Sequence, residues 1–401
     1  MIVVKENFSE IKRRIYSIDI LRGAVMLIMA LDHVRDYFHI HAFDDTPTNM
    51  ATTTSLLFFT RWITHFCAPT FVFLSGVSAF LSGQKRSKKE LSKFLLTRGA
   101  WLVFVELFIV TLAWTFNPLY NLFILQVIWA IGWSMIILGL LVRSSFQIVL
   151  AYGLVVVLGH NFLDYAEAAR NGQVNLFWNF VHHGFFYQVP LGKNHVAMIV
   201  YAVLPWSGVI ALGYCFGTWF KNNVSSQVRT KRLLWLGSSL VVAFIILRFI
   251  NSYGDPVQWS EQPRGAVYTF LSFLNTTKYP PSLMFLCMTL GPAIIALALL
   301  ESAQNKFSKI LITYGRVPFF YYVIHLYLIH FVQVIFFFAA GYGWNQVVDT
   351  RTPFLFRPLN FGYDLPIVYV VWLFTIVALY WPCKWFNKYK STHYQWWLSY
   401  V

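Results

Sequence analysis

The sequence predicts an all-α membrane protein, a polytopic helix bundle of about ten transmembrane helices with its N- and C-termini in the cytoplasm. Composition is the first reason: the 401 residues are 58% hydrophobic and only 12% charged, with a mean hydropathy of +0.56. The second reason is that apolar residues gather into stretches long enough to cross a bilayer. The third is an uneven distribution of Lys and Arg between these stretches.

The apolar stretches predict the spans. Each has about the length that a helix needs to cross the hydrocarbon core at 1.5 Å per residue. They lie near residues 20–40, 56–82, 94–116, 119–141, 146–163, 196–219, 233–250, 279–300, 317–339 and 364–386. No segment between them is long enough for a separate soluble domain, so residues 1–401 are predicted to form a single transmembrane domain.

Basic residues orient the bundle. Lys and Arg are about three times as numerous in one alternate set of connecting segments, including 83–98, as in the other. This places both termini inside. The net charge of +15 then reports topology and contact with anionic membrane lipid, and no nucleic-acid partner is predicted. The N-terminal segment lacks a small-residue cleavage site, so we expect the first span to be retained as an anchor.

Metal and disulfide chemistry are not predicted. The four cysteines, Cys67, Cys215, Cys287 and Cys383, lie in apolar stretches without ligand-type spacing, so they are expected to be small core residues. The chain contains no HExxH motif, no Gly-rich phosphate loop and no Cys/His cluster, so no metal is predicted.

The first span carries ionisable residues, which are costly in a membrane and usually functional there. Arg22 and His33 are eleven residues apart, or about three helical turns, so they share one face about 16 Å apart along the axis. Asp32 adjoins His33, and Asp36 lies on the His33 face. A cation near the inner surface and an imidazole deeper in the membrane suit a long molecule with an anionic head and a reactive tail, such as acyl-coenzyme A.

An acyl transfer needs a base for the acceptor and a donor for the oxyanion. His33 is the candidate base, since imidazole titrates near neutral pH. Asp32 or Asp36 could orient it, and spacing does not decide between them. His65 reaches a similar depth and is a second candidate, with an interhelical hydrogen bond as the alternative. Arg61, one turn from His65, or a backbone amide could stabilise the oxyanion.

Arginines near the inner surface could bind the phosphates of a coenzyme A head, because their planar forks match phosphate oxygens. Arg22, Arg98 and Arg316 are the candidates. The alternative, which is favoured for Arg98, is positive-inside charge alone.

The long outer segments near 164–195, 251–278 and 341–363 are rich in aromatic residues with Asn, His and Gly. An aromatic belt at the membrane interface is the favoured interpretation. The alternative is a platform that stacks on sugar rings.

Several motifs resemble one family. The run from Arg14 to Gly23, followed by Leu-Asp-His-Val-Arg-Asp up to Asp36, is similar to the opening of heparan-α-glucosaminide N-acetyltransferase-like proteins of bacterial membranes. Further similar runs are 68–76, 204–213, 278–283 and 314–325. The spacing of Arg22 and His33 also resembles the Arg-x10-His pattern of membrane-bound type 3 acyltransferases.

This resemblance implies an inner-membrane acyltransferase that moves an acetyl group from cytoplasmic acetyl-coenzyme A to an extracytoplasmic glycan or glycolipid, with Arg22 and His33 in the matching roles. His33, His39, His41 and His65 all lie where the family's catalytic histidine is expected. The identity of the acceptor is left open, and so is whether an oxygen or a nitrogen is acetylated. A homo-oligomer is possible in either case. The alternatives are a transporter or flippase for a glycan or lipid intermediate and, less favoured, a non-catalytic membrane scaffold.

Overall fold

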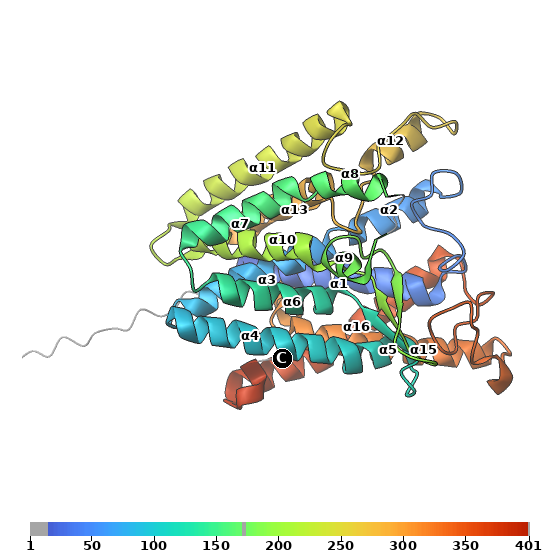
Figure 1. Cartoon of the computed structure of the whole chain (residues 1–401). Helices are drawn as coiled ribbons and strands as arrows, with labels where there is room; N and C mark the ends of the chain where they lie inside the picture. The colour runs from blue at the N-terminus through green and yellow to red at the C-terminus, as the bar shows by residue number, and fades with distance from the viewer. Residues whose placement is uncertain (1–14, 171–173, 400–401) are drawn as a thin grey trace, which may run out of the picture.

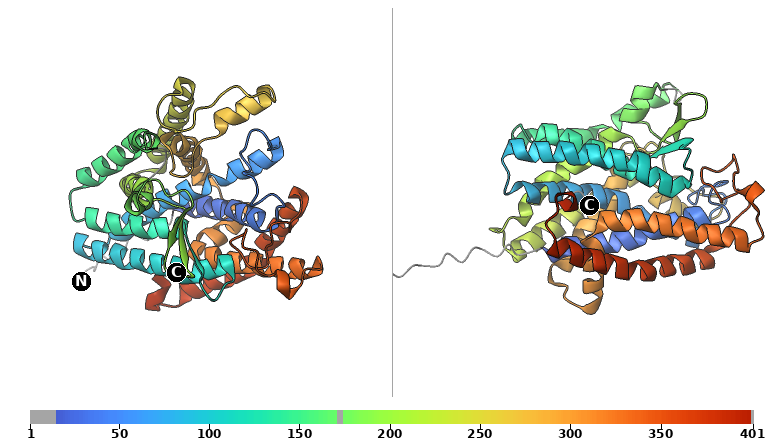
Figure 2. Two further views of the ribbon diagram at one scale, coloured as in Figure 1. Left: turned by 45° about the vertical axis from the view of Figure 1, so that its right-hand side comes forward. Right: turned by 90° about the horizontal axis from the view of Figure 1, so that it is seen from below.

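The computed structural model describes residues 15–170 and 174–399. Long helices run side by side, and short helices and strands gather near one end (Figures 1 and 2). The helices are α1 Tyr16–Phe38, α2 Ser55–Thr64, α3 Cys67–Gly83, α4 Lys88–Val105, α5 Thr111–Thr115, α6 Val127–Leu141, α7 Phe146–Gly159, α8 Phe162–Ala168, α9 Leu176–Val181, α10 Val203–Phe216, α11 Ser226–Ile250, α12 Ala266–Leu274, α13 Leu283–Leu299, α14 Lys306–Gly315, α15 Pro318–Ala339 and α16 Leu365–Thr392.

Within the described residues, seven helices are long and apolar enough to cross a membrane, or eight if α7 and α8, which meet at a bend of 42°, form one span. Each coincides with a predicted stretch. The predicted first span is α1, whose 23 residues include five charged side chains. The predicted fourth contains α6, which has only 15 residues. The chain is therefore a helical membrane protein.

Two predicted spans begin later than expected because strands occupy their first residues. Strand β1, Leu122–Leu125, precedes α6, and β3, Val196–Ile199, precedes α10. With β2, Tyr187–Pro190, they form a small sheet in the order β1-β3-β2. β3 pairs in parallel with β1 and antiparallel with β2. Short apolar runs of this kind are hard to distinguish from helix by sequence alone.

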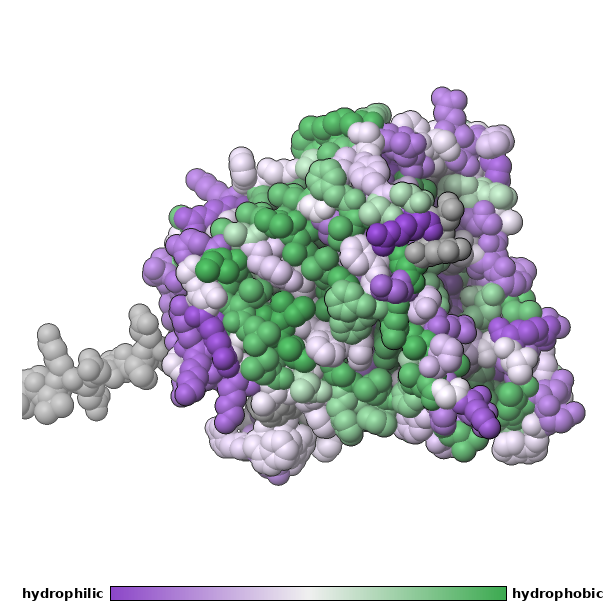
Figure 3. Space-filling view, in the orientation of Figure 1, coloured by the Kyte–Doolittle hydropathy of each residue, from purple (hydrophilic) through white to green (hydrophobic). Residues whose placement is uncertain are grey.

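Surface hydropathy agrees with a membrane location. In Figure 3, apolar residues cover the middle of the visible face, and polar residues gather toward its two ends. The most exposed spanning helix is α11, on which Trp235 and Phe249 are 76% and 68% exposed. Apolar side chains on the outside of a bundle are expected where the surrounding solvent is lipid.

Polar residues begin several helices. Ser87, Ser145 and Ser225 each accept a hydrogen bond from a backbone N–H in the first turn of α4, α7 and α11. Ser87 and Glu90 form a complete capping box. These contacts satisfy amide groups that would otherwise lack partners at a helix start.

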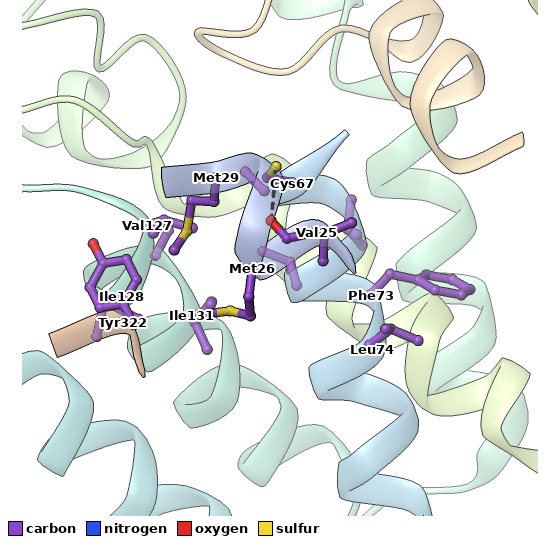
Figure 4. Packing of buried hydrophobic residues seen from close by; sticks show 14 of the residues in the cluster. Val25, Met26, Met29, Cys67, Phe73, Leu74, Val127, Ile128, Ile131 and Tyr322 are labelled. Atoms are coloured by element: carbon purple, nitrogen blue, oxygen red, sulfur yellow. Dashed lines mark hydrogen bonds between the residues drawn. The ribbon is translucent and has the colours of Figure 1, made fainter. Parts of the chain in front are cut away.

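Helix α1 lies in the core and packs against α3, α14, α15 and α16. Met26 and Met29 point toward Ile131 and its neighbours on α6 (Figure 4). The Cys67 thiol donates a hydrogen bond of 3.3 Å to the carbonyl of Val25. All four cysteines are free and buried, as predicted. The charged face of α1 is thus enclosed by protein.

Candidate active site

His33 on α1 lies against His325 on α15. His33 Nδ1 and His325 Nε2 are 2.7 Å apart, and both side chains are buried. Trp114 meets the His33 ring edge-on at a centroid distance of 4.9 Å. Packing against α15 and α5 therefore fixes the position of the imidazole.

The hydrogen bonds around this pair determine where the protons lie. His325 Nδ1 is 3.0 Å from the carbonyl oxygen of Tyr321. A carbonyl only accepts, so Nδ1 of His325 carries the proton and Nε2 of the neutral ring is an acceptor. His33 must then donate from its Nδ1. This assignment leaves the lone pair of neutral His33 on Nε2, the state that a general base requires.

Neither carboxylate expected beside His33 bonds to its Nδ1. Asp32 Oδ1 accepts from Arg35 at 3.2 Å, and Asp32 Oδ2 accepts from Arg61. Asp36 Oδ1 also accepts from Arg35, at 2.6 Å. Asp32 and Asp36 therefore hold two arginines in place, and in this structure the group that orients His33 is His325.

The buried charges near His33 do not balance. Arg35, Arg61, Asp32 and Asp36 form an ion-paired group of two cations and two anions. Lys278 is also 9% exposed, and its charge acts on Asp32, His33 and His65. No carboxylate lies within ion-pair distance of Lys278 in the described part of the chain. Lys278 thus adds a buried positive charge to this region that no carboxylate of the described residues pairs.

The segment that carries Lys278 is tied down by Asp255. This carboxylate accepts hydrogen bonds from Thr277 N at 2.8 Å, Thr277 Oγ1 at 2.9 Å and Ser282 Oγ at 2.6 Å. Burial raises the pKa of Asp255, and the bonds from Ser282 and Thr277 oppose that shift. The Lys278 ammonium lies 5.1 Å from the Tyr279 ring centroid. A rigid segment can hold the cation without reorganisation.

His65 lies at the break between α2 and α3. Its ring meets Phe285 edge-on at 5.4 Å, and its Nδ1 has no hydrogen-bond partner among the described residues. An interhelical hydrogen bond was the alternative role for His65, and Nδ1 makes no such bond with the described residues. His65 shares the electrostatic environment of Arg61 and Lys278.

Two other buried ionisable residues, Glu106 and His330, have structural contacts. Glu106 Oε1 accepts from the backbone N–H of Gln126 at 2.9 Å, at the start of α6. His330 lies 3.1 Å from the Ala113 carbonyl and 3.0 Å from the Leu355 carbonyl. These contacts tie both side chains to neighbouring backbone, whereas Glu106 Oε2 is buried without a hydrogen-bond partner among the described residues.

At the other end of α1, Asp19 brings two of the predicted phosphate-binding arginines together. Its carboxylate lies 3.6 Å from Arg22 and 3.8 Å from Arg316. Arg22 also donates to Ser78 Oγ at 2.9 Å. The helices can approach this closely because of a glycine: a Cβ on Gly315 would lie 1.8 Å from the Asp19 carbonyl oxygen.

Arg98 occupies a different helix. Its guanidinium lies 6.0 Å from the Phe94 ring centroid on α4, and α4 packs chiefly against α6. The structure thus brings Arg22 and Arg316 together through Asp19 and places Arg98 on a separate helix pair.

A cavity of about 260 Å³ opens just beyond the C-terminal end of α1. Its lining includes His39, His41, Asp45, Thr46 and Thr52. Arg357 is fully buried and donates to the His39 carbonyl at 2.7 Å. Polar side chains around a concave surface can bind hydroxyl groups.

Sequence reasoning did not select His325 or Lys278 as site residues. His325 lies in an aromatic-rich span with a second histidine, and one helix cannot reveal which face meets α1. Lys278 comes from the segment just before α13, which was expected to be an outer connection, where a positive charge is usually exposed. An intramembrane histidine and a basic residue at the edge of a span are the signals that could have found them.

Comparison with known families gives the class of the protein. The family model of the heparan-alpha-glucosaminide N-acetyltransferase catalytic domain matches residues 14–247, more than half of the chain. The chain belongs to this family. Membership makes it an acetyltransferase of the membrane-embedded kind. The matched region includes Arg22, Asp32, His33, Asp36 and His65, whereas Lys278, Arg316 and His325 lie beyond it. No curated protein matches the chain.

Proposed function

We propose that this protein transfers an acetyl group from cytoplasmic acetyl-coenzyme A to an extracytoplasmic glycan or glycolipid. The observation that carries the proposal is the hydrogen-bond chain from the Tyr321 carbonyl through His325 to His33, because it presents the Nε2 lone pair of His33. Family membership supports the acetyl chemistry, and the geometry supports His33 as the general base.

In the proposed reaction, the acceptor hydroxyl or amine attacks the thioester carbonyl while His33 Nε2 removes its proton. The Lys278 ammonium and Arg61 stabilise the negative charge that develops on the carbonyl oxygen. The C–S bond then breaks, and the thiolate of coenzyme A leaves. The His33 imidazolium returns its proton to that thiolate, so the protein ends in its starting state.

Donor and acceptor would enter from opposite ends of α1. Arg22 and Arg316 are proposed to bind the phosphates of coenzyme A, because both are held by Asp19 at the inner end of the helix. Arg98 remains a weaker candidate for the same role. His65 is the alternative candidate for the base. Asp32 and Asp36 position Arg35 and Arg61. The outer cavity around His39 and Asp45 is proposed to admit the acceptor.

The topology completes the proposal. We propose ten spans, with α1, α6 and the α7–α8 pair added to the seven candidates that are long and apolar enough, and both termini in the cytoplasm. The Lys and Arg bias supports this orientation. α1 can cross despite its charges, since they pair within the bundle. The single domain 1–401 would then reside in the plasma (inner) membrane of a bacterium.

The test is release of free coenzyme A by purified protein in detergent, with acetyl-coenzyme A as donor. Glucosamine, N-acetylglucosamine and lipid-linked glycans serve as a panel of acceptors, and acetylated products are identified by mass spectrometry. We expect acceptor-dependent release that is lost in His33→Gln. Binding without any acetylated product, together with acceptor movement across proteoliposomes, would support a transporter instead.

A further inference from the structure

A second cluster of ionisable side chains lies outside the proposed active site, where α8 and α9 meet the end of α7. It contains His160, Asp164, Glu167, His182 and His183. His182 and Glu167 are 0% and 7% exposed. Burying a carboxylate and several imidazoles together requires specific compensation.

The carboxylate of Glu167 is the centre of the cluster. Its Oε1 lies 2.7 Å from His182 Nδ1 and accepts from Trp178 Nε1 at 2.6 Å. Its Oε2 lies 3.0 Å from His183 Nδ1. The other ring nitrogen of His182, Nε2, is 3.1 Å from His160 Nδ1. Glu167 on one side and His160 on the other therefore orient the His182 ring.

Asp164 completes the set of possible ligand atoms. One oxygen of Asp164, one of Glu167 and one nitrogen of His182 all lie within 4.8 Å of one another. We propose that Asp164, Glu167 and His182 form a binding site for a divalent transition-metal ion, for which zinc is the best match. Imidazole with carboxylates is a donor set that zinc accepts, and water can fill a remaining position.

The surrounding contacts suit such an ion. A tetrahedral zinc with bonds of about 2.0–2.1 Å separates neighbouring ligand atoms by roughly 3.3 Å, so the ion would replace the proton between His182 and Glu167 with a small outward shift. His182 Nε2 would then donate its remaining proton to His160. Metal-bound histidines commonly hold a hydrogen bond of this kind, which fixes the ring. His183 lies close enough to act as a further partner of Glu167.

The site would also brace the segment that carries Lys278. Asn161, beside His160, accepts from the backbone N–H of Leu283 at 2.8 Å and donates to Asp164 at 2.7 Å. A metal at Asp164 would therefore fix the contact between α8 and the start of α13. This role is structural, so the site does not depend on the proposed reaction.

The test is metal content of the full-length protein in detergent. The protein is stripped with EDTA, incubated with zinc, freed of excess metal and measured by mass spectrometry, and its thermal unfolding midpoint is compared with and without zinc. We expect about one zinc per chain and a higher midpoint with the metal. Uptake should fall at lower pH, because protons compete for the imidazole.

Three variants and one control locate the ion. His182→Gln and Glu167→Gln should lose the zinc and the zinc-dependent rise in midpoint, and Asp164→Asn should weaken binding about tenfold or more. Asp164 is only half-buried, so that variant still tests the site if the others fail to fold. His195→Gln alters an exposed histidine in the same outer region that contacts the Tyr120 carbonyl, and it should bind as wild type does.

Two results would overturn the site. One is negligible zinc uptake by wild-type protein with no change in its midpoint. The other is full uptake by both Asp164→Asn and His182→Gln. Both results are read from metal content and unfolding, so they do not depend on acetyl-transfer activity.

Discussion

Replacing His325 with Phe tests the tautomer argument. The ring of Phe can keep the stacking on Tyr321, whose centroid is 5.2 Å away, but it cannot accept the proton of His33 Nδ1. That buried donor loses its partner, at a cost of about 1–3 kcal/mol. The unpaired imidazole can also exchange its proton between the two nitrogens. We therefore expect the transfer rate kcat to fall by roughly one to two decades, since each decade corresponds to about 1.4 kcal/mol.

The assay is release of coenzyme A at saturating donor, together with the dissociation constant for a non-hydrolysable acetyl-coenzyme A analogue. His325→Gln should recover part of the rate, because its amide oxygen can accept the His33 proton. His330→Gln is the matched control: it changes a buried histidine on the same helix that bonds to Ala113 and Leu355 instead. An unchanged kcat in folded His325→Phe, or an equal loss in His330→Gln, would show that His325 does not set the tautomer of His33.

Three further predictions concern the donor site, the packing of α1 and the topology. Arg22→Ala should weaken binding of the acetyl-coenzyme A analogue by roughly one to two decades in isothermal titration. Arg22→Lys should recover part of the affinity, because ammonium keeps the charge but loses the two-pronged geometry of guanidinium. Equal affinity in wild type and Arg22→Ala would exclude Arg22 as a phosphate-binding residue. Gly315→Ala should lower the thermal unfolding midpoint, since its Cβ would meet the Asp19 backbone, whereas Gly159→Ala adds a Cβ with nothing within 4 Å and should be nearly neutral; equal midpoints would contradict the close α1–α14 packing. Single cysteines at Ser87 and Gly192 should react with impermeant reagents from opposite sides of the membrane, and labelling from one side would remove the cytoplasmic-donor proposal.

Much of the fold could be predicted from the sequence, because a membrane span leaves a simple signal. A helix that crosses lipid must be long and apolar, and every predicted stretch contains a helix. The signal fails where the chain leaves lipid. Residues 122–125 and 196–199 are apolar because they are covered by protein, and they pair as strands.

The site was less predictable. Arg22, Asp32 and His33 are conspicuous because charge inside a span is costly. Their partners depend on how distant helices pack: His325 is 292 residues from His33 along the chain. Spacing along α1 left Asp32 and Asp36 as alternatives for orienting His33, but Arg35 binds both carboxylates. The Glu167 cluster was equally hidden, because its proposed ligands come from α8 and the end of α9 and form no recognised motif.

The most direct test of the central claim is the transfer rate of His33→Gln at saturating acetyl-coenzyme A, measured beside its affinity for the donor analogue. Gln keeps hydrogen-bonding capacity at a similar size, and it cannot act as a base at neutral pH. If His33 is the general base, we expect a loss of roughly two to four decades in kcat with normal expression and nearly unchanged donor affinity. Activity within about threefold of wild type would contradict it and make His65 the first alternative base.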